Sequence, residues 1–150
     1  MFRHILVPLD GSTHSQNALE KAADLALHYK ARVSILHVIT DVLRSRVPDE
    51  LRDYATMEHV QVTENDMLLA VARKLVETAE LQLRELGLSD MTLSIDTGNV
   101  ASKIVEFSQE NDVDLIVMGR RGLGDLSGLL LGSVSHKVCH LADCACLTVK

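Results

Sequence analysis

The chain has 150 residues, of which 47% are hydrophobic and 24% are charged, and its formal net charge is -6 at pH 7. This size and composition indicate one globular domain over residues 1–150. The chain is acidic and has no basic stripe, so a nucleic-acid partner is not expected. No apolar run reaches the roughly 18 residues of a membrane span, and the opening "MFRHILVPLDGS" is typical of a strand and turn rather than of a signal peptide, so no membrane partner is expected.

Strand-like and helix-like patterns alternate along the chain. The strands are expected at residues 4–9, 31–39, 91–96, 113–119 and 145–150. The helices are expected within residues 10–30, 63–86, 101–111 and 133–143. Thr13 and Gln16 have the spacing of a capping box at the start of the first helix, and Gly87 is placed to end the second.

This alternation predicts βαβ units, and therefore an α/β fold with an open, doubly wound parallel sheet of five strands and helices on both faces. In such sheets ligands bind beyond the carboxyl ends of the strands, where the strand order reverses. The first strand ends at Pro8 and Asp10, and the fourth ends at Gly119. If these two strands are neighbours, both ends meet at one crevice.

Glycine is concentrated directly after the fourth strand, in "GRRGLGDLSGLLLGSVSHK". Glycines such as Gly119, Gly122 and Gly132 allow a ligand to approach the backbone closely. A helix that starts at Ser133 directs free N–H groups and the positive end of its dipole at that ligand, and the Ser133 and Ser135 hydroxyls add donors. The stretch therefore predicts a phosphate-binding site.

Arg120 and Arg121 follow the fourth strand directly and have two interpretations. They are either solvated loop charges or ligands that add a charge-assisted bond to a phosphate. The loop is not a Walker loop, because no glycine precedes a lysine, and it does not have the G-x-G-x-x-G spacing of a dinucleotide site.

The spacing G-x2-G-x9-G-[ST], which Gly119, Gly122, Gly132 and Ser133 satisfy, resembles the nucleotide-binding pattern of the universal stress protein family. The segments "ILVPLDGS", "LHV" and "LTVK" also look like that family, whereas Val100 and Ala145 stand where it often has proline. The resemblance implies a sheet order of 3-2-1-4-5, a Rossmann-like fold, and a cytoplasmic, homodimeric, ATP-binding protein of the stress response.

The same resemblance implies a role for each motif residue. Pro8 and Asp10 border the adenosine, and the Val38 backbone meets the edge of the adenine. The loop from Gly119 to Gly122, including Arg120 and Arg121, covers the ribose and phosphates. The phosphates are held by Gly132, Ser133, Val134 and Ser135.

Asp10 has two interpretations, because Asp-Gly is also a common turn pair. A carboxylate repels phosphates, so a functional Asp10 needs a bridging Mg²⁺ or Mn²⁺, or a ribose hydroxyl. His14, on the first turn of the next helix, is expected to be exposed.

The sequence is compatible with three functions. The first is an ATP-dependent sensor or adaptor for an unidentified protein partner, the second a slow ATPase or phosphotransferase, and the third a dimeric interaction protein without nucleotide. The segment from Thr40 to Val62, which contains Tyr54, is expected to flank the nucleotide and to order when ATP binds. The last strand is expected to form the homodimer by edge pairing.

Cys139, Cys144 and Cys146 make an odd number of cysteines in a chain without an export signal, which predicts reduced thiols and a cytoplasmic location. His136 and His140 lie close to them in the sequence and raise the alternative of a zinc site. The preferred interpretation is that these residues pack in the fold, because small buried cysteines are common in cores.

Overall fold

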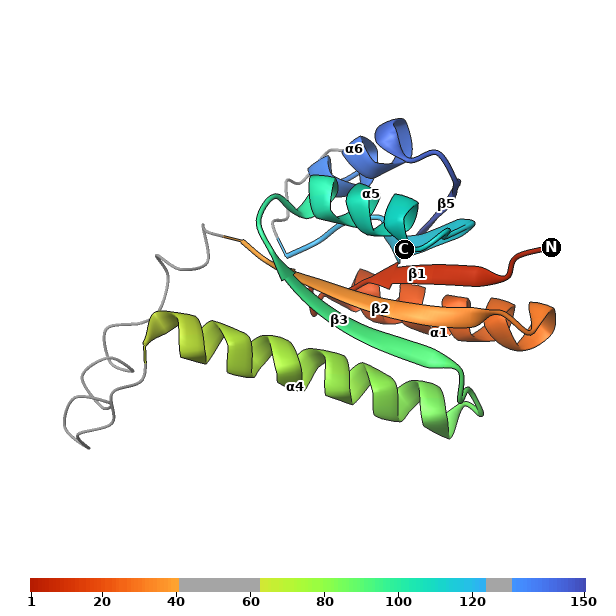
Figure 1. The fold of residues 1–150 in the computed structure, drawn as a ribbon, viewed down its shortest axis with the longest axis horizontal. Coiled ribbons are helices and arrows are strands. Elements are labelled where there is room, and N and C mark those ends of the chain that lie inside the picture. The colour runs from red at the N-terminus through yellow and green to blue at the C-terminus, as the bar shows by residue number, and fades with distance from the viewer. Residues whose placement is uncertain (41–62, 124–130) are drawn as a thin grey trace.

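Strands and helices alternate as predicted in the computed structural model, which describes residues 1–40, 63–123 and 131–150 (Figure 1). The strands are β1 (His4–Pro8), β2 (Arg32–Ile39), β3 (Met91–Thr97), β4 (Leu115–Gly119) and β5 (Ala145–Val149). The helices are α1 (Thr13–Tyr29), α4 (Glu64–Glu85), α5 (Val100–Glu110) and α6 (Ser133–Leu141). The predicted ATP-ordered segment lies, beyond Thr40, outside the described residues, and so does Tyr54.

The five strands form one parallel sheet in the order β3-β2-β1-β4-β5. The central strand β1 pairs with β2 on one side and with β4 on the other, and Ile5 is in register with both Val33 and Leu115. This order confirms the doubly wound fold. It also confirms that the first and fourth strands are neighbours, so their carboxyl ends lie side by side.

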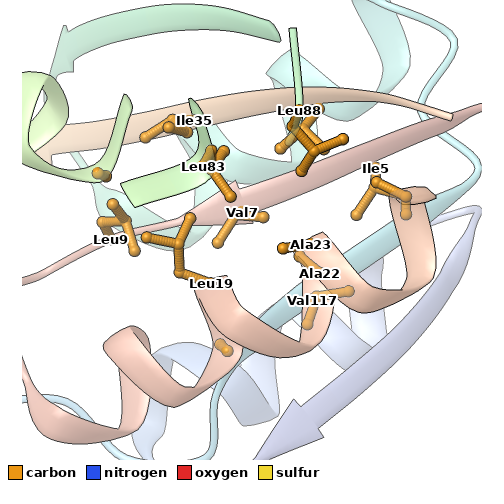
Figure 2. Close-up of a cluster of buried hydrophobic side chains, with 14 of the residues drawn as sticks. Ile5, Val7, Leu9, Leu19, Ala22, Ala23, Ile35, Leu83, Leu88 and Val117 are labelled. Atoms are coloured by element: carbon orange, nitrogen blue, oxygen red, sulfur yellow. The ribbon is translucent and has the colours of Figure 1, made fainter. Parts of the chain in front are cut away.

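Each face of the sheet has its own hydrophobic core. Helices α1 and α4 cover one face and α5 and α6 the other (Figure 1). The core under α1 and α4 is drawn in Figure 2 and includes Ile5, Val7, Leu19, Ile35, Leu83 and Val117. The core under α5 and α6 includes Leu6, Leu36, Val38, Ile104, Ile116, Met118 and Val138. Adjacent residues of β1 and β4 thus point into different cores, which is why these strands are apolar without alternation.

Helix α1 starts one residue earlier than the sequence predicted. Ser12 has extended backbone angles (φ -72°, ψ 157°), and its side chain accepts a hydrogen bond from the Ser15 N–H. The predicted capping box of Thr13 and Gln16 is therefore wrong. The reason is that the Asp10 carboxylate accepts the Ser12 N–H at 2.9 Å, which completes the turn before Ser12 and makes that residue the cap.

The end of α4 is where the sequence placed it. Gly87 has φ +94°, its N–H donates to the Arg84 carbonyl at 3.0 Å, and the Leu88 N–H donates to the Leu83 carbonyl at 2.9 Å. This is a Schellman motif, which needs a residue that tolerates positive φ. No helix in the described ranges combines the length and the apolarity that crossing a membrane requires.

Candidate functional site

The site is built where β1 and β4 end side by side and the first turn of α1 crosses them. Gly119 is the last residue of β4. A Cβ on Gly119 would lie 2.9 Å from the carbonyl carbon of His14 and from the backbone nitrogen of Ser15. Glycine is therefore needed here so that the backbone of α1 can lie directly on the end of β4.

Asp10 and Gly122 lie close together beyond the ends of β1 and β4. The Asp10 Oδ1 accepts the Ser12 N–H, and a Cβ on Gly122 would lie 2.5 Å from the Asp10 Oδ2. The structure thus brings together two residues that the sequence had assigned to one site from separate motifs. The Asp10 carboxylate also holds the turn before α1, as the alternative interpretation of Asp10 proposed. This role does not depend on a ligand.

His14 fixes the glycine loop to α1. Its Nδ1 accepts a hydrogen bond from the Arg121 N–H at 3.2 Å, and the Ser12 hydroxyl donates to the Arg121 carbonyl at 3.4 Å. The expectation that His14 is exposed is wrong, because its side chain is half-buried against this loop. No pattern near His14 signals the contact, since the two residues are 107 positions apart.

Arg120 joins three elements through its backbone. Its N–H donates to the Val149 carbonyl at 2.6 Å, and its own carbonyl accepts the Gly132 N–H at 2.8 Å and the Ser135 hydroxyl at 2.9 Å. The start of α6 is thereby held against the first residues after β4. The Ser135 side chain is buried, at 4% exposed, and its hydroxyl proton is directed at backbone oxygens.

The start of α6 differs from the other helix starts that the structure describes. Ser12 caps α1, Thr63 forms a capping box with Asp66 at α4, and Asn99 caps α5 through its side chain. The cap of α6 is Gly132, which has no side chain and makes no side-chain bond to the helix. The first N–H groups of α6 are therefore left for solvent or for an anion.

A cleft of about 400 Å³ opens beside this helix start, between α6, the start of α5 and the end of β2. Its lining residues are Thr40, Gly98, Asn99, Val100, Ala101, Ser133, Val134 and Lys137. Asp10 and Gly122 do not line it. Pro8 is half-buried at the end of β1, and Val38 and Met118 are buried in the core under α5 and α6.

The sequence missed Asn99 and Lys137 as lining residues of the cleft, whereas Thr40 begins the segment that was expected to flank the nucleotide. Asn99 precedes α5 and Lys137 lies within α6, and no spacing pattern joins them. The available signal was "GN" after the third strand, where Asn99 is a helix cap at the same edge of the sheet as the glycine loop.

Comparison with known proteins gives the same picture over the whole chain. A sequence model described as "Universal stress protein family" matches residues 1–150. Universal stress protein YxiE of Bacillus subtilis is 34% identical over 100% of both chains. Universal stress protein MJ0531 of Methanocaldococcus jannaschii is 31% identical over 100% of this chain and 83% of its own length.

A solved structure of a universal stress protein in complex with cAMP is 25% identical, with a TM-score of 0.70, and covers 99% of this chain and 97% of its own. The fold, the glycine spacing and these relatives agree, and the chain belongs to the universal stress protein family.

Proposed function

We propose that this chain binds an adenine nucleotide, ATP by the family pattern, and acts as a nucleotide-dependent sensor or adaptor in a stress response. The observation that carries the proposal is the uncapped start of α6 beside a glycine loop in which a Cβ on Gly122 would meet the Asp10 carboxylate. The cAMP complex of a relative that is 25% identical supports an adenine nucleotide as the ligand class.

The phosphates belong, in this proposal, at the start of α6. The backbone N–H groups of Ser133, Val134 and Ser135 are the donors, and the ammonium of Lys137 lines the same cleft one turn further on. Because Ser135 directs its hydroxyl at Arg120, it contributes its backbone N–H and braces the loop with its side chain. The Arg120 and Arg121 side chains remain candidates for additional phosphate contacts.

The adenosine belongs nearer to the strand ends. Half-buried Pro8 supplies an apolar surface and Val38 supplies main-chain polar groups for the adenine, and Asp10 borders the ribose. If a divalent cation accompanies a bound triphosphate, Asp10 would hold it, and the ion would supply the positive charge that offsets repulsion between the carboxylate and the phosphates. One carboxylate fits Mg²⁺, which keeps several waters and is commonly bound by one or two carboxylates and the phosphates. Asp10 is the proposed metal residue on that ground.

The proposal includes a cytoplasmic homodimer formed through β5. This strand lies at the edge of the sheet, with β4 as its neighbour on one side, and Leu147 is 39% exposed. An exposed strand edge presents unpaired backbone groups that a second copy can satisfy around a two-fold axis.

Nucleotide binding is tested on freshly purified protein in two steps. Denaturation followed by mass spectrometry identifies any nucleotide that copurifies, and calorimetric titration with ATP, AMP and cAMP ranks the ligands. Gly122→Ala forces a Cβ against the Asp10 carboxylate and is expected to lower affinity at least about tenfold, a loss of about 1.4 kcal/mol. Leu123→Ala is the matched control, because Leu123 is in the same loop and is 69% exposed.

Equal affinity of the wild type and Gly122→Ala would remove the phosphate site from this loop. Absence of binding by the folded wild type to all three nucleotides would favour the alternative of an interaction protein that does not use nucleotide.

A further inference from the structure

The cleft beside α6 is bordered by two helix starts. The first residues of α5, Val100 and Ala101, line it on one side and the first residues of α6, Ser133 and Val134, on the other, and the two helices pack side by side (Figure 1). The N-terminal end of a helix carries a partial positive charge. No carboxylate is among the described residues that line the cleft. The cleft is therefore electropositive, although the chain as a whole is acidic.

Lys137 adds a full positive charge to the wall of this cleft. It lies on α6, one turn after Ser133, and its side chain is exposed. In the described part of the chain its ammonium makes no ion pair, whereas Lys103 on α5 pairs with Glu106 at 2.9 Å and with Asp96 at 3.6 Å. An unpaired ammonium at the wall of a cavity can bind an anion that enters the cavity.

Arg120 brings a second cation to the same face of the sheet. Its N–H extends the β4–β5 ladder by donating to the Val149 carbonyl, so its side chain is expected on the side of Met118, which packs in the core under α5 and α6. The Arg120 Nε atom is buried and has no hydrogen-bond partner within residues 1–40, 63–123 and 131–150. A buried donor without a partner is costly, which points to an acceptor that a ligand supplies.

A chain of phosphates is the ligand group that fits these two cations. The volume of the cleft, about 400 Å³, suits a small molecule rather than a macromolecule. A single phosphate at the start of α6 uses the backbone N–H groups of that helix. Each further phosphate brings more negative charge and more acceptor oxygens, and Lys137 lies one turn, about 5.4 Å, further along the helix. The ammonium is thus placed to contact a long phosphate chain rather than a single phosphate.

We propose that Lys137 and Arg120 make the site selective for the length of the phosphate chain, so that ATP binds more tightly than ADP, and ADP more tightly than AMP or cAMP. The inference rests on the proposed nucleotide site and adds to it the residues that distinguish one nucleotide from another. The cyclic phosphate of cAMP carries the least negative charge of the four, so cAMP gains least from the two cations.

The experiment is a calorimetric titration of the full-length protein with each of the four nucleotides in EDTA, so that no divalent cation offsets the phosphate charge. The wild type is expected to bind ATP at least about tenfold more tightly than AMP. Lys137→Met removes the charge and keeps an unbranched side chain. It is expected to weaken ATP binding about fivefold and AMP binding less than about twofold.

Lys74→Met is the matched control. Lys74 is exposed on α4, which covers the opposite face of the sheet, and its replacement changes the net charge by the same amount. The variant is expected to keep the wild-type affinities for ATP and AMP. A loss of ATP affinity equal to that of Lys137→Met would assign the effect to net charge and overturn the role of Lys137.

Arg120→Met gives a second readout, which a structural side chain would not give. The backbone bonds of Arg120 to Val149, Gly132 and Ser135 do not involve its side chain. Removal of a buried donor without a partner is expected to keep or raise the free energy of unfolding without nucleotide, as measured by urea denaturation. The same variant is expected to lose about tenfold in ATP affinity and less in AMP affinity. A loss of stability with unchanged selectivity would overturn the role of Arg120.

Two further results would overturn the inference while leaving the proposed function in place. The first is equal affinity of the wild type for ATP and AMP. The second is the same fold loss for ATP and AMP in Lys137→Met, which would show that the ammonium does not distinguish the two ligands. A folded wild type that binds none of the four nucleotides would instead overturn the proposed function, and this inference with it.

Discussion

The Nδ1 atom of His14 accepts the backbone N–H of Arg121 at 3.2 Å, and this bond ties the first turn of α1 to the glycine loop after β4. The acceptor role leaves the proton of the neutral ring on Nε2. His14 therefore positions the loop without belonging to the glycine motif.

His14→Ala is expected to weaken nucleotide binding more than it weakens the fold. A hydrogen bond of this kind contributes about 0.5–1.5 kcal/mol net, which corresponds to a loss of up to roughly tenfold in affinity. Calorimetric titration with ATP measures it. His28→Ala on the last turn of the same helix is the control, and equal affinities for the two variants would show that the bond does not position the site.

Gly119→Ala is expected to lower the stability of the fold, whereas Gly122→Ala is expected to lower the affinity for nucleotide. A Cβ at Gly119 meets backbone atoms of α1, which cannot move aside, so we expect a loss of about 1–3 kcal/mol in the free energy of unfolding. A Cβ at Gly122 meets the far end of the Asp10 side chain, which can rotate, so stability is kept and affinity falls. Urea denaturation measures the first effect, and the same loss of stability in both variants would contradict the distinction.

Asp10→Asn removes the charge of Asp10 but keeps an oxygen that can accept the Ser12 N–H. If Asp10 supports a cation, ATP affinity is expected to fall in Mg²⁺ and to stay level or rise in EDTA, because repulsion of the phosphates is removed. Parallel titrations under the two conditions decide this. An equal loss in both would indicate a ribose contact and would withdraw the metal role.

Thr148→Pro is expected to disrupt the proposed dimer while leaving the sheet intact. The Val149 carbonyl accepts a bond from Arg120 and so points towards β4. Backbone groups of successive strand residues point to opposite sides, which directs the Thr148 N–H outwards and the Leu147 N–H towards β4. Light scattering is expected to find a folded monomer for Thr148→Pro, whereas Leu147→Pro destabilises the sheet itself. A folded Thr148→Pro dimer would place the interface elsewhere.

His4 gives the fold a dependence on pH. Its Nδ1–H donates to the Asn111 carbonyl at 2.9 Å, and its Nε2 accepts from the Ser34 hydroxyl at 2.7 Å, which in turn lies 2.7 Å from the Thr92 hydroxyl. His4 is 4% exposed. Burial is the main cause that lowers its pKa below the ordinary 6.5, Arg32 acts in the same direction, and the Asn111 bond, Asp114 and Asp90 oppose it.

The unfolded chain therefore binds a proton at His4 that the folded chain releases. The stability that neutral His4 contributes is complete above about pH 6.5 and is lost as the pH falls below that value, by at most about 1.4 kcal/mol per pH unit. Urea denaturation between pH 7.5 and 5 measures this loss. A His4→Gln variant whose stability falls with the same slope would assign the dependence to other groups.

Much of the architecture could be predicted from the pattern of apolar residues. The runs "ILVPL" and "LIVM" have no alternation because β1 and β4 face a core on each side, and Gly87 ends α4 because positive φ is needed there. The glycine spacing was interpreted as room for a ligand near the backbone, whereas in the structure Gly119 lies against the backbone of α1 and Gly122 against the Asp10 side chain. The start of α1 was predicted incorrectly. The Asp10 carboxylate accepts the Ser12 N–H and makes Ser12 the cap, and the spacing of Thr13 and Gln16 does not show this bond.

By itself, the sequence determined the elements and the parallel sheet, because the apolar patterns and turn signals that specify them lie within a few neighbouring residues. What excludes a Cβ at Gly119 and Gly122 was decided by the tertiary structure, because the atoms concerned belong to α1 and to Asp10, far away in the sequence.

The tertiary structure alone decided that His14 meets Arg121 and that Ser135 binds the Arg120 carbonyl. These contacts join residues from different elements, and the packing of helices on the sheet brings them within a few ångströms. The spacing of residues along the chain does not predict such distances.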